Sequence, residues 1–381
     1  MTHDAQILQA PLIPRKTRLE ALWQLFRQNR LAIVGLFIFV LFFITAVLGA
    51  IVTSGHDPLF DPALIRLQEK LLPPLSGPHT DALPEHELPT MGIYLFGTDD
   101  LGRDVFSRML QGAWVSLTVG FVAVGISVIV GIFMGGIAGY FGERHIRYHH
   151  ILVIGLFFAS GVFLLMGSMG TGAMVFLTGC AFTALFILSN RKTTIRSGIS
   201  WLYKDAISVD TLIMRAVDIM LCFPSFFLIL TVVALLPASM YNIMIVIGLT
   251  SWMGTTRFVR AEFLSLREQD FVTAARALGI GNFRIIFRHM MPNAIAPVLV
   301  SSTIGIATAI LTEAGLSFLG FGVPPPHATW GNILSGGKGF IFDAPWLTFI
   351  PGIAILIVVL CFNLFGEGLR DAMNPKLRER G

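Results

Sequence analysis

Long runs of uncharged, apolar residues constrain the fold of this chain more than any other feature. Residues 31–53 contain no charged side chain, and neither do residues 109–142. A helix needs about 20 mainly apolar residues to cross the hydrocarbon core of a bilayer. Only 13% of the chain is charged, against about a quarter in soluble domains. The sequence therefore predicts an all-α polytopic membrane protein.

We expect eight membrane spans, four of which come from two runs that are too long for a single helix. The run 151–190 divides at a turn of small residues that begins at Gly167, and the run 219–256 divides at residues 237–242. The other four spans are predicted at about 31–53, 115–141, 293–312 and 345–366.

The distribution of Lys and Arg sets the orientation, because basic residues concentrate in cytoplasmic segments. With the N-terminus in the cytoplasm, the outer segments hold few of the 27 basic residues, namely Arg66, Lys70, Arg103, Arg108 and Lys338. Eight spans return the chain to its starting side, so both termini are predicted to be cytoplasmic. The predicted organisation is a cytoplasmic N-terminal segment (1–30), a first span (31–53), an outer, periplasmic loop (54–110), a transmembrane domain (111–366) and a cytoplasmic tail (367–381).

The predicted cytoplasmic loop 257–292 ends in a basic, amphipathic segment, residues 270–292. Glycine is a poor helix former and a good helix stop, so Gly279 and Gly281 predict two short helices joined by a hinge. Pro292 would then begin the next span. Two interpretations are open: the segment lies on the membrane with Arg276 and Arg284 facing lipid phosphates, or it docks onto a protein partner.

Strong patterns typical of metal or nucleotide sites are absent from the sequence. The three cysteines fall inside apolar runs without zinc spacing. His145 and His149, and His79 and His86, could each contribute to a weak metal site, but a solvated surface is the better interpretation of both pairs.

Gly337 and Lys338 resemble part of a phosphate loop, but Gly339 stands where Ser or Thr is needed. We therefore expect a chain that is not an enzyme and binds no cofactor or metal; if the protein uses ATP, a separate subunit must hydrolyse it.

Charged groups at membrane depth are typical of ion-coupled transporters. No predicted span of this chain carries a charge at its centre. Asp218 and Glu313 are expected at the ends of spans, as interfacial residues. This pattern disfavours an ion-coupled secondary transporter or channel, and neutralising Glu313 would test that alternative.

The spacing within residues 270–292 resembles the cytoplasmic EAA loop of ATP-binding cassette (ABC) importer permeases. The family pattern is Glu-Ala-Ala, three residues, Gly, nine residues and Ile-x-Leu-Pro. Here the same spacing reads Thr273-Ala274-Ala275, Gly279 and His289-Met290-Met291-Pro292, with Thr273 in place of the Glu. The resemblance implies a coupling helix seated in a groove of the ATPase subunit, with apolar docking by Phe271, Ala275 and Leu278. The residues it assigns to this loop are Phe271, Thr273, Ala274, Ala275, Leu278, Gly279 and Pro292.

Four further stretches resemble dipeptide and oligopeptide permeases of the DppC/OppC type. They are GTDDLGRD at 97–104, which precedes the second span in that subfamily, and residues 214–230, 316–334 and 362–378. The resemblance assigns an outer motif to Gly97, Thr98, Asp99, Gly102, Arg103 and Asp104. It also implies that the outer loops near 97–103 and 324–330 face a solute-binding protein.

An insertion at about 145–205 departs from the subfamily, whose permeases have six spans. The chain is therefore expected to combine a six-span ABC importer permease core with an inserted hairpin of two spans. We favour a peripheral, lipid-facing hairpin; the alternative is packing against the partner permease or an accessory protein.

Taken together, the resemblance implies the permease subunit of an ATP-driven importer for peptides or similar small solutes in the bacterial inner membrane. The expected partners are a homologous second permease, two ABC ATPase subunits, an extracytoplasmic solute-binding protein and membrane lipid, but no nucleic acid. Alternatives are import of another solute such as a nickel complex, an ion-coupled secondary transporter or channel, and a non-transporting scaffold or sensor.

Overall fold

The computed structural model describes residues 18–373, except for 56–57, 81–82, 85–86, 143–144 and most of 148–204. Most of the predicted hairpin at about 145–205 therefore lies outside the described residues. The same is true of residues 1–17 and of the tail beyond Met373.

Two compact units make up the chain. The first contains Met1–Val130, Pro224–Thr255 and Ala294–Gly381, and the second contains Gly131–Phe223 and Thr256–Asn293. Helices predominate in both, as the sequence predicts.

Helix α2 (Arg30–Val52) is the first predicted span, and it follows a short helix, α1 (Arg18–Gln28). Asn29 separates the two and caps α2, because its Oδ1 accepts the amide hydrogens of Leu31 at 3.1 Å and Ala32 at 3.2 Å. The uncharged run 31–53 and the Asn29 cap agree: the helix starts at Arg30, within one residue of the prediction.

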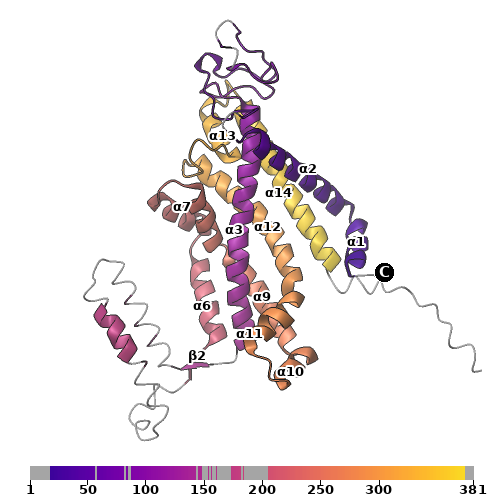
Figure 1. Cartoon of the computed structure of the whole chain (residues 1–381), viewed down its shortest axis with the longest axis vertical. Coiled ribbons are helices and arrows are strands. Elements are labelled where there is room, and N and C mark those ends of the chain that lie inside the picture. Colours follow the sequence, from indigo (N-terminus) through magenta and orange to yellow (C-terminus); the bar gives the residue numbers. More distant parts are fainter. Residues whose placement is uncertain are drawn as a thin grey trace, which may run out of the picture. The chain divides into compact units, whose positions relative to one another are not determined.

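Helix α14 (Trp346–Met373) lies along α2 in the first unit (Figure 1). Small residues let the two helices approach closely: a Cβ on Gly35 would lie 2.9 Å from Cβ of Leu364, and one on Gly368 would lie 2.1 Å from Cβ of Ala32. Within a bilayer, helices associate through such close van der Waals packing. The remaining core of this unit contains Val119, Ile243, Ile247, Ile310 and Leu347, all nearly inaccessible.

Helix α3 (Val105–Phe141) has 37 residues and begins well before the predicted start at 115. Asp104 caps it by accepting the amide hydrogens of Phe106 at 3.2 Å and Ser107 at 3.1 Å. Apolar runs report only the part of a helix that lies in lipid, so the polar first turns of α3 were not predicted.

The run 219–256 contains more breaks than the two predicted spans require. Its region folds as α6 (Val209–Cys222), α7 (Ser225–Leu235), α8 (Met240–Leu249) and α9 (Trp252–Arg267). The break after Leu235 falls where the sequence predicts it. A second break, at Phe223, was missed; Pro224 disfavours helical geometry in the preceding residue, and Phe223 is extended, with φ −88° and ψ 133°.

Four helices of the described residues are long and apolar enough to cross a membrane, or five if α6 and α7 form one broken span. They are α2, α3, α14 and the continuous helix Asn282–Phe318, which contains α11 (Asn282–Arg284), a π-helical turn (Ile285–Met290) and α12 (Met291–Phe318). The prediction of eight spans with both termini in the cytoplasm stays a prediction.

A short antiparallel pair of strands departs from the all-α prediction. Strand β1 (His145–Arg147) pairs with β2 (Asp205–Ser208), so that His145 lies opposite Ser208 and Ile146 opposite Ile207. Backbones in such a pair lie about 5 Å apart. The two ends of residues 148–204 therefore meet at one point of the second unit.

The predicted outer loop also has local structure. It contains a 3₁₀ turn at Leu67–Glu69 and two isolated β-bridges, Ser76 with Tyr94 and Thr98 with Asp104. The second predicted outer region contains α13 (Trp330–Gly337) and a 3₁₀ turn at Lys338–Phe340.

Candidate functional site

The 270–292 segment belongs to the second unit and begins with helix α10 (Asp270–Ala277). Gly279 ends this helix with φ +71°. The amide of Ile280 donates to the Ala275 carbonyl at 3.1 Å, and the amide of Gly279 donates to that of Arg276 at 3.0 Å. This is the Schellman arrangement, in which glycine takes the left-handed position after the C-cap. The predicted first helix and its glycine stop are confirmed.

The second predicted short helix is wrong, because the chain from Asn282 continues without a break into α12. Pro292 consequently lies inside a helix and does not begin one. Proline lacks an amide hydrogen and its ring crowds the carbonyl four residues earlier. A π-helical turn precedes it, where the amide of Met291 donates to the Ile286 carbonyl five residues back. This wider turn lets the helix accommodate Pro292.

The two faces of α10 differ in exposure. Val272 and Ala275 are buried against the chain itself, whereas Thr273, Ala274 and Leu278 are exposed, Leu278 by 79%. Phe271 is partly exposed. The structure thus places one of the three predicted docking residues, Ala275, on the inner face, because residues three apart, such as Val272 and Ala275, share one side of a helix.

The end of α3 packs closely against α9 within the second unit. A Cβ on Gly135 would lie 2.6 Å from the Thr256 carbonyl oxygen, and one on Gly139 would lie 2.5 Å from Cβ of Phe263. These glycines are four residues apart and so lie on one face of α3, which is the spacing that lets helices approach closely in membrane proteins. Helix α10 itself contacts the π-helical turn Ile285–Met290 of the same unit.

Ion pairs hold α6 to α9 in the same unit. Arg260 makes a bidentate pair with Asp210, and Arg257 Nη2 lies 2.8 Å from Oδ1 of Asp218. Hydrogen bonding to Asp210 raises the pKa of Arg260 above its ordinary value. Asp218, which the sequence placed at the end of a span, therefore has a basic partner on α9.

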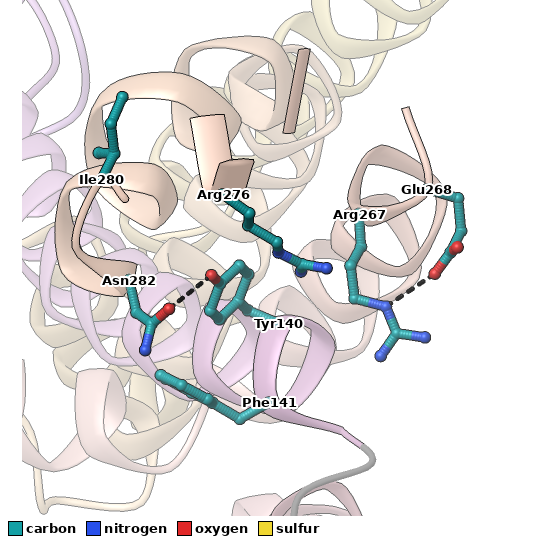
Figure 2. A pocket seen from close by; sticks show the side chains of 7 residues that line it. All are labelled: Tyr140, Phe141, Arg267, Glu268, Arg276, Ile280 and Asn282. Atoms are coloured by element: carbon teal, nitrogen blue, oxygen red, sulfur yellow. Dashed lines mark hydrogen bonds and ion pairs between the residues drawn. The ribbon is translucent and has the colours of Figure 1, made fainter. Parts of the chain in front are cut away.

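A pocket of about 550 Å³ opens between the end of α3 and the 270–292 segment. Figure 2 shows its lining: Tyr140, Phe141, Arg267, Glu268, Arg276, Ile280 and Asn282. The Tyr140 hydroxyl donates to Oδ1 of Asn282 at 2.8 Å, and the Arg276 guanidinium lies over the Tyr140 ring, 5.0 Å from its centroid. Arg267 Nε donates to Glu268 at 2.9 Å. The sequence analysis missed Tyr140, Arg267 and Asn282, although Gly135 and Gly139 were a visible signal of close packing there.

The outer motif 97–104 lies in the first unit and is largely buried. Thr98 is inaccessible, Asp99 is 3% exposed and Asp104 is 8% exposed. Gly97 and Gly102 both have positive φ, and a Cβ on Gly102 would lie 1.7 Å from the Arg66 carbonyl oxygen. Only glycine fits there, because both the backbone angle and the space require it.

Asp99 is the centre of this motif. Its Oδ1 accepts the amide hydrogens of Leu101 and Arg103, both at 2.9 Å, and its Oδ2 pairs with Arg103 Nε at 2.8 Å and with Arg108. Arg108 also donates to Oδ1 of Asn332 in α13, at 3.2 Å. The buried carboxylate is thus fully partnered and links the two predicted outer regions.

Two tryptophans reinforce the same link. Trp330 Nε1 donates to the Met109 carbonyl at 3.1 Å, and Trp346 Nε1 donates to the Thr98 carbonyl at 3.2 Å. The motif residues Gly97, Thr98, Asp99, Gly102, Arg103 and Asp104 therefore lie together in one hydrogen-bonded cluster.

Glu313 is enclosed by the protein. Because α12 continues to Phe318, this residue falls inside the helix and is inaccessible to solvent. Ser317 Oγ donates to its Oε1 at 2.6 Å. The helix thus continues past the predicted span end at about residue 312, and the interfacial position of Glu313 stays a prediction.

Comparison with known proteins defines the class. Residues 199–379 match the family described as the binding-protein-dependent transport system inner membrane component, and residues 17–74 match the N-terminal transmembrane domain of oligopeptide transport permease C. The chain belongs to this family of transport permeases and is a multi-pass protein of the bacterial inner membrane.

Among curated proteins, the chain is similar to DppC and OppC subunits. It is 36% identical to the dipeptide transport system permease protein DppC of Alkalihalophilus pseudofirmus, over 94% of this chain and 90% of the relative. It is 31% identical to the oligopeptide transport system permease protein OppC of Bacillus subtilis, over 93% and 88%. It is also 31% identical to the di/tripeptide transport system permease protein DppC of Pseudomonas aeruginosa, over 97% and 95%. The resemblance to the DppC/OppC type is confirmed.

Proposed function

We propose that this chain is the permease subunit of an ATP-driven importer of peptides or similar small solutes, and that α10 couples it to a separate ATPase subunit. The observation that carries the coupling role is the two-faced structure of α10. Val272 and Ala275 anchor the helix to its own unit, while Leu278 and, beyond the hinge, Phe283 are exposed by 79% and 68%. Exposed apolar side chains on a helix whose opposite face is buried are suited to bind in a groove of another protein.

The continuous helix Asn282–Phe318 offers a route for coupling. It begins directly after the Gly279–Gly281 hinge and is 37 residues long. A displacement of α10 by the ATPase subunit would reach the membrane through this one helix. In the proposed mechanism, ATP-driven closure of the ATPase subunits thereby reorients the spans and alternates access to the pathway.

The other partners follow from the same proposal. A homologous second permease would complete the translocation pathway, two ATPase subunits would bind ATP and Mg²⁺, and a solute-binding protein would deliver substrate outside. The buried cluster around Asp99 would maintain the shape of the outer surface that the binding protein meets. Peptide is the favoured substrate because the relatives' names specify dipeptides, oligopeptides or di- and tripeptides.

Leu278→Asp tests the coupling role, because it places a charge on the exposed face without disturbing buried packing. In the reconstituted transporter, we expect this variant to lose most substrate-stimulated ATP hydrolysis. Phe342→Asp is the matched control, since Phe342 is 97% exposed in the predicted outer region. Equal activities for the two variants would refute coupling through α10. Ala275 is unsuitable for this test, because a charge there would destabilise the unit.

A further inference from the structure

The pocket beside α10 has a positive lining that the coupling role does not explain. Arg276 and Arg267 both line it (Figure 2). Arg276 packs over the Tyr140 ring, and no carboxylate of the described residues forms an ion pair with it. The hydrogen bond from Tyr140 to Asn282 fixes the ring on which Arg276 rests. The guanidinium is therefore held in place with its hydrogen-bonding edge available.

Arg267, the other arginine of the pocket, already forms an ion pair with Glu268 of the same chain. The Glu268 side chain is 72% exposed, and its pair with Arg267 joins adjacent residues. Arg267 itself is only 14% exposed, but the Glu268 carboxylate is open to solvent, so another carboxylate could reach Arg267 from the same side and exchange with Glu268. The pocket can thus accept an acidic group while Arg267 remains charge-compensated throughout.

The position of the pocket favours a protein partner over lipid. Leu278, the exposed residue through which α10 is proposed to dock onto the ATPase subunit, lies between Arg276 and Ile280, which both line the pocket. A protein that contacts Leu278 would therefore also meet the pocket.

We propose that this pocket receives an Asp or Glu side chain of the ATPase subunit, which pairs with Arg276 and displaces Glu268 from Arg267. This inference rests on the proposed coupling function. It gives the interface a second, electrostatic contact beside the apolar contact of Leu278. It also fits the replacement of the family's Glu by Thr273, because the charge at this interface would then lie on basic residues of the permease.

Affinity of the full permease pair for its ATPase subunit, measured in nanodiscs, tests the proposal. Arg276→Glu should weaken binding about tenfold or more, as expected for loss of a close interfacial charge pair. Arg276→Lys should retain most of the affinity. Arg284→Glu is the matched control, an exposed arginine of the same segment outside the pocket, and should change binding less than twofold. Equal effects of Arg276→Glu and Arg284→Glu would overturn the proposal.

Three further measurements make the test specific. Glu268→Gln, a fold-neutral change at an exposed site, should tighten binding about twofold by removing the competing carboxylate; weaker binding would count against the proposal. In the Arg276→Glu background, changing one acidic surface residue of the ATPase subunit to Arg should restore affinity, and failure of every such exchange would overturn the pairing. Finally, an Arg276→Glu effect that requires phosphatidylglycerol in the nanodisc would assign the pocket to lipid phosphate instead.

Leu278→Asp separates this inference from the proposed function. If Leu278→Asp abolishes ATPase binding while Arg276→Glu has no effect, only the pocket inference fails. If neither variant changes ATPase binding, the coupling role itself fails.

Discussion

Alanine substitutions at Gly279 and Gly281 would measure how much the hinge after α10 depends on the left-handed backbone conformation of glycine. A Cβ on either glycine would meet nothing within 4 Å, so neither substitution causes a steric clash. The two differ in backbone angle, with φ +71° at Gly279 and φ −62° at Gly281. Gly279→Ala should therefore cost about 1–2 kcal/mol, the penalty for a left-handed alanine.

Gly281→Ala is the matched control. Alanine lowers the conformational entropy of the unfolded chain, which stabilises the fold by about 0.4–1 kcal/mol. This offsets the roughly 0.5–1 kcal/mol lost because alanine is a poorer N-cap than glycine. The net change should lie within about 0.5 kcal/mol. The difference between the two variants then isolates the cost of the left-handed conformation.

Hydrogen exchange of the amides of Gly279 and Ile280, which bond to the carbonyls of Arg276 and Ala275, is the appropriate assay. In Gly279→Ala, we expect the position-280 amide to exchange about 5–30-fold faster, since 1–2 kcal/mol corresponds to that factor. Gly281→Ala should leave its exchange within about twofold. Equal exchange in the two variants would refute the argument that the left-handed turn, and not space, requires glycine.

Three other predictions concern the insertion, the outer motif and the outer loop. Replacing residues 148–204 by an Asn-Gly turn should leave the melting temperature of the purified chain nearly unchanged, because β1 and β2 already join the two ends; a large fall would show that the insertion packs on the core. Asp99→Asn should destabilise the chain by about 3–5 kcal/mol in thermal unfolding, because it leaves Arg108 buried without its charge partner, whereas Asp100→Asn, at a partly exposed site, should change stability little. Burial raises the pKa of Tyr94 to about 12 from its ordinary value of 10.0. The contribution of neutral Tyr94 to stability is therefore fully present below pH 10 and is lost as pH rises through about 12. Unfolding between pH 9 and 12 should therefore depend less on pH in Tyr94→Phe, and identical profiles would contradict the burial argument.

Hydropathy predicted the positions of the membrane helices better than their lengths. The starts of α2 and α14 fall within a residue of prediction, because their apolar runs begin sharply. Helix α3 begins before its predicted span but ends with it at Phe141, whereas α12 extends past its predicted span at both ends. Outside lipid, a helix is stabilised by caps such as Asp104 and by packing against its neighbours, and an apolar run carries no signal of either.

Local chemistry predicted the hinge of the 270–292 segment but not its surroundings. Glycine at 279 signals a helix stop by its residue type alone. Ala274 and Ala275 have the same side chain, so the sequence contained no signal of which one faces inward. Tyr140 and Asn282 are 142 residues apart, and only the folded chain brings them into one pocket. Deviations of this kind follow from tertiary packing, which single-residue propensities do not describe.

The continuous helix from Asn282 to Phe318 could act as a lever, in which a small tilt at one end moves the other end by several ångströms. Its 37 residues span about 55 Å at 1.5 Å per residue, so a tilt of about 5° about one end would move the other end by about 5 Å. The π-helical turn, Pro292 and Pro297 all lie in the half nearer α10. Bending is easiest at such points. The rest of this helix, up to Glu313 and its bond to Ser317, contains no proline and would move as a stiff rod, so motion of α10 reaches it only after bending at these points has absorbed a share.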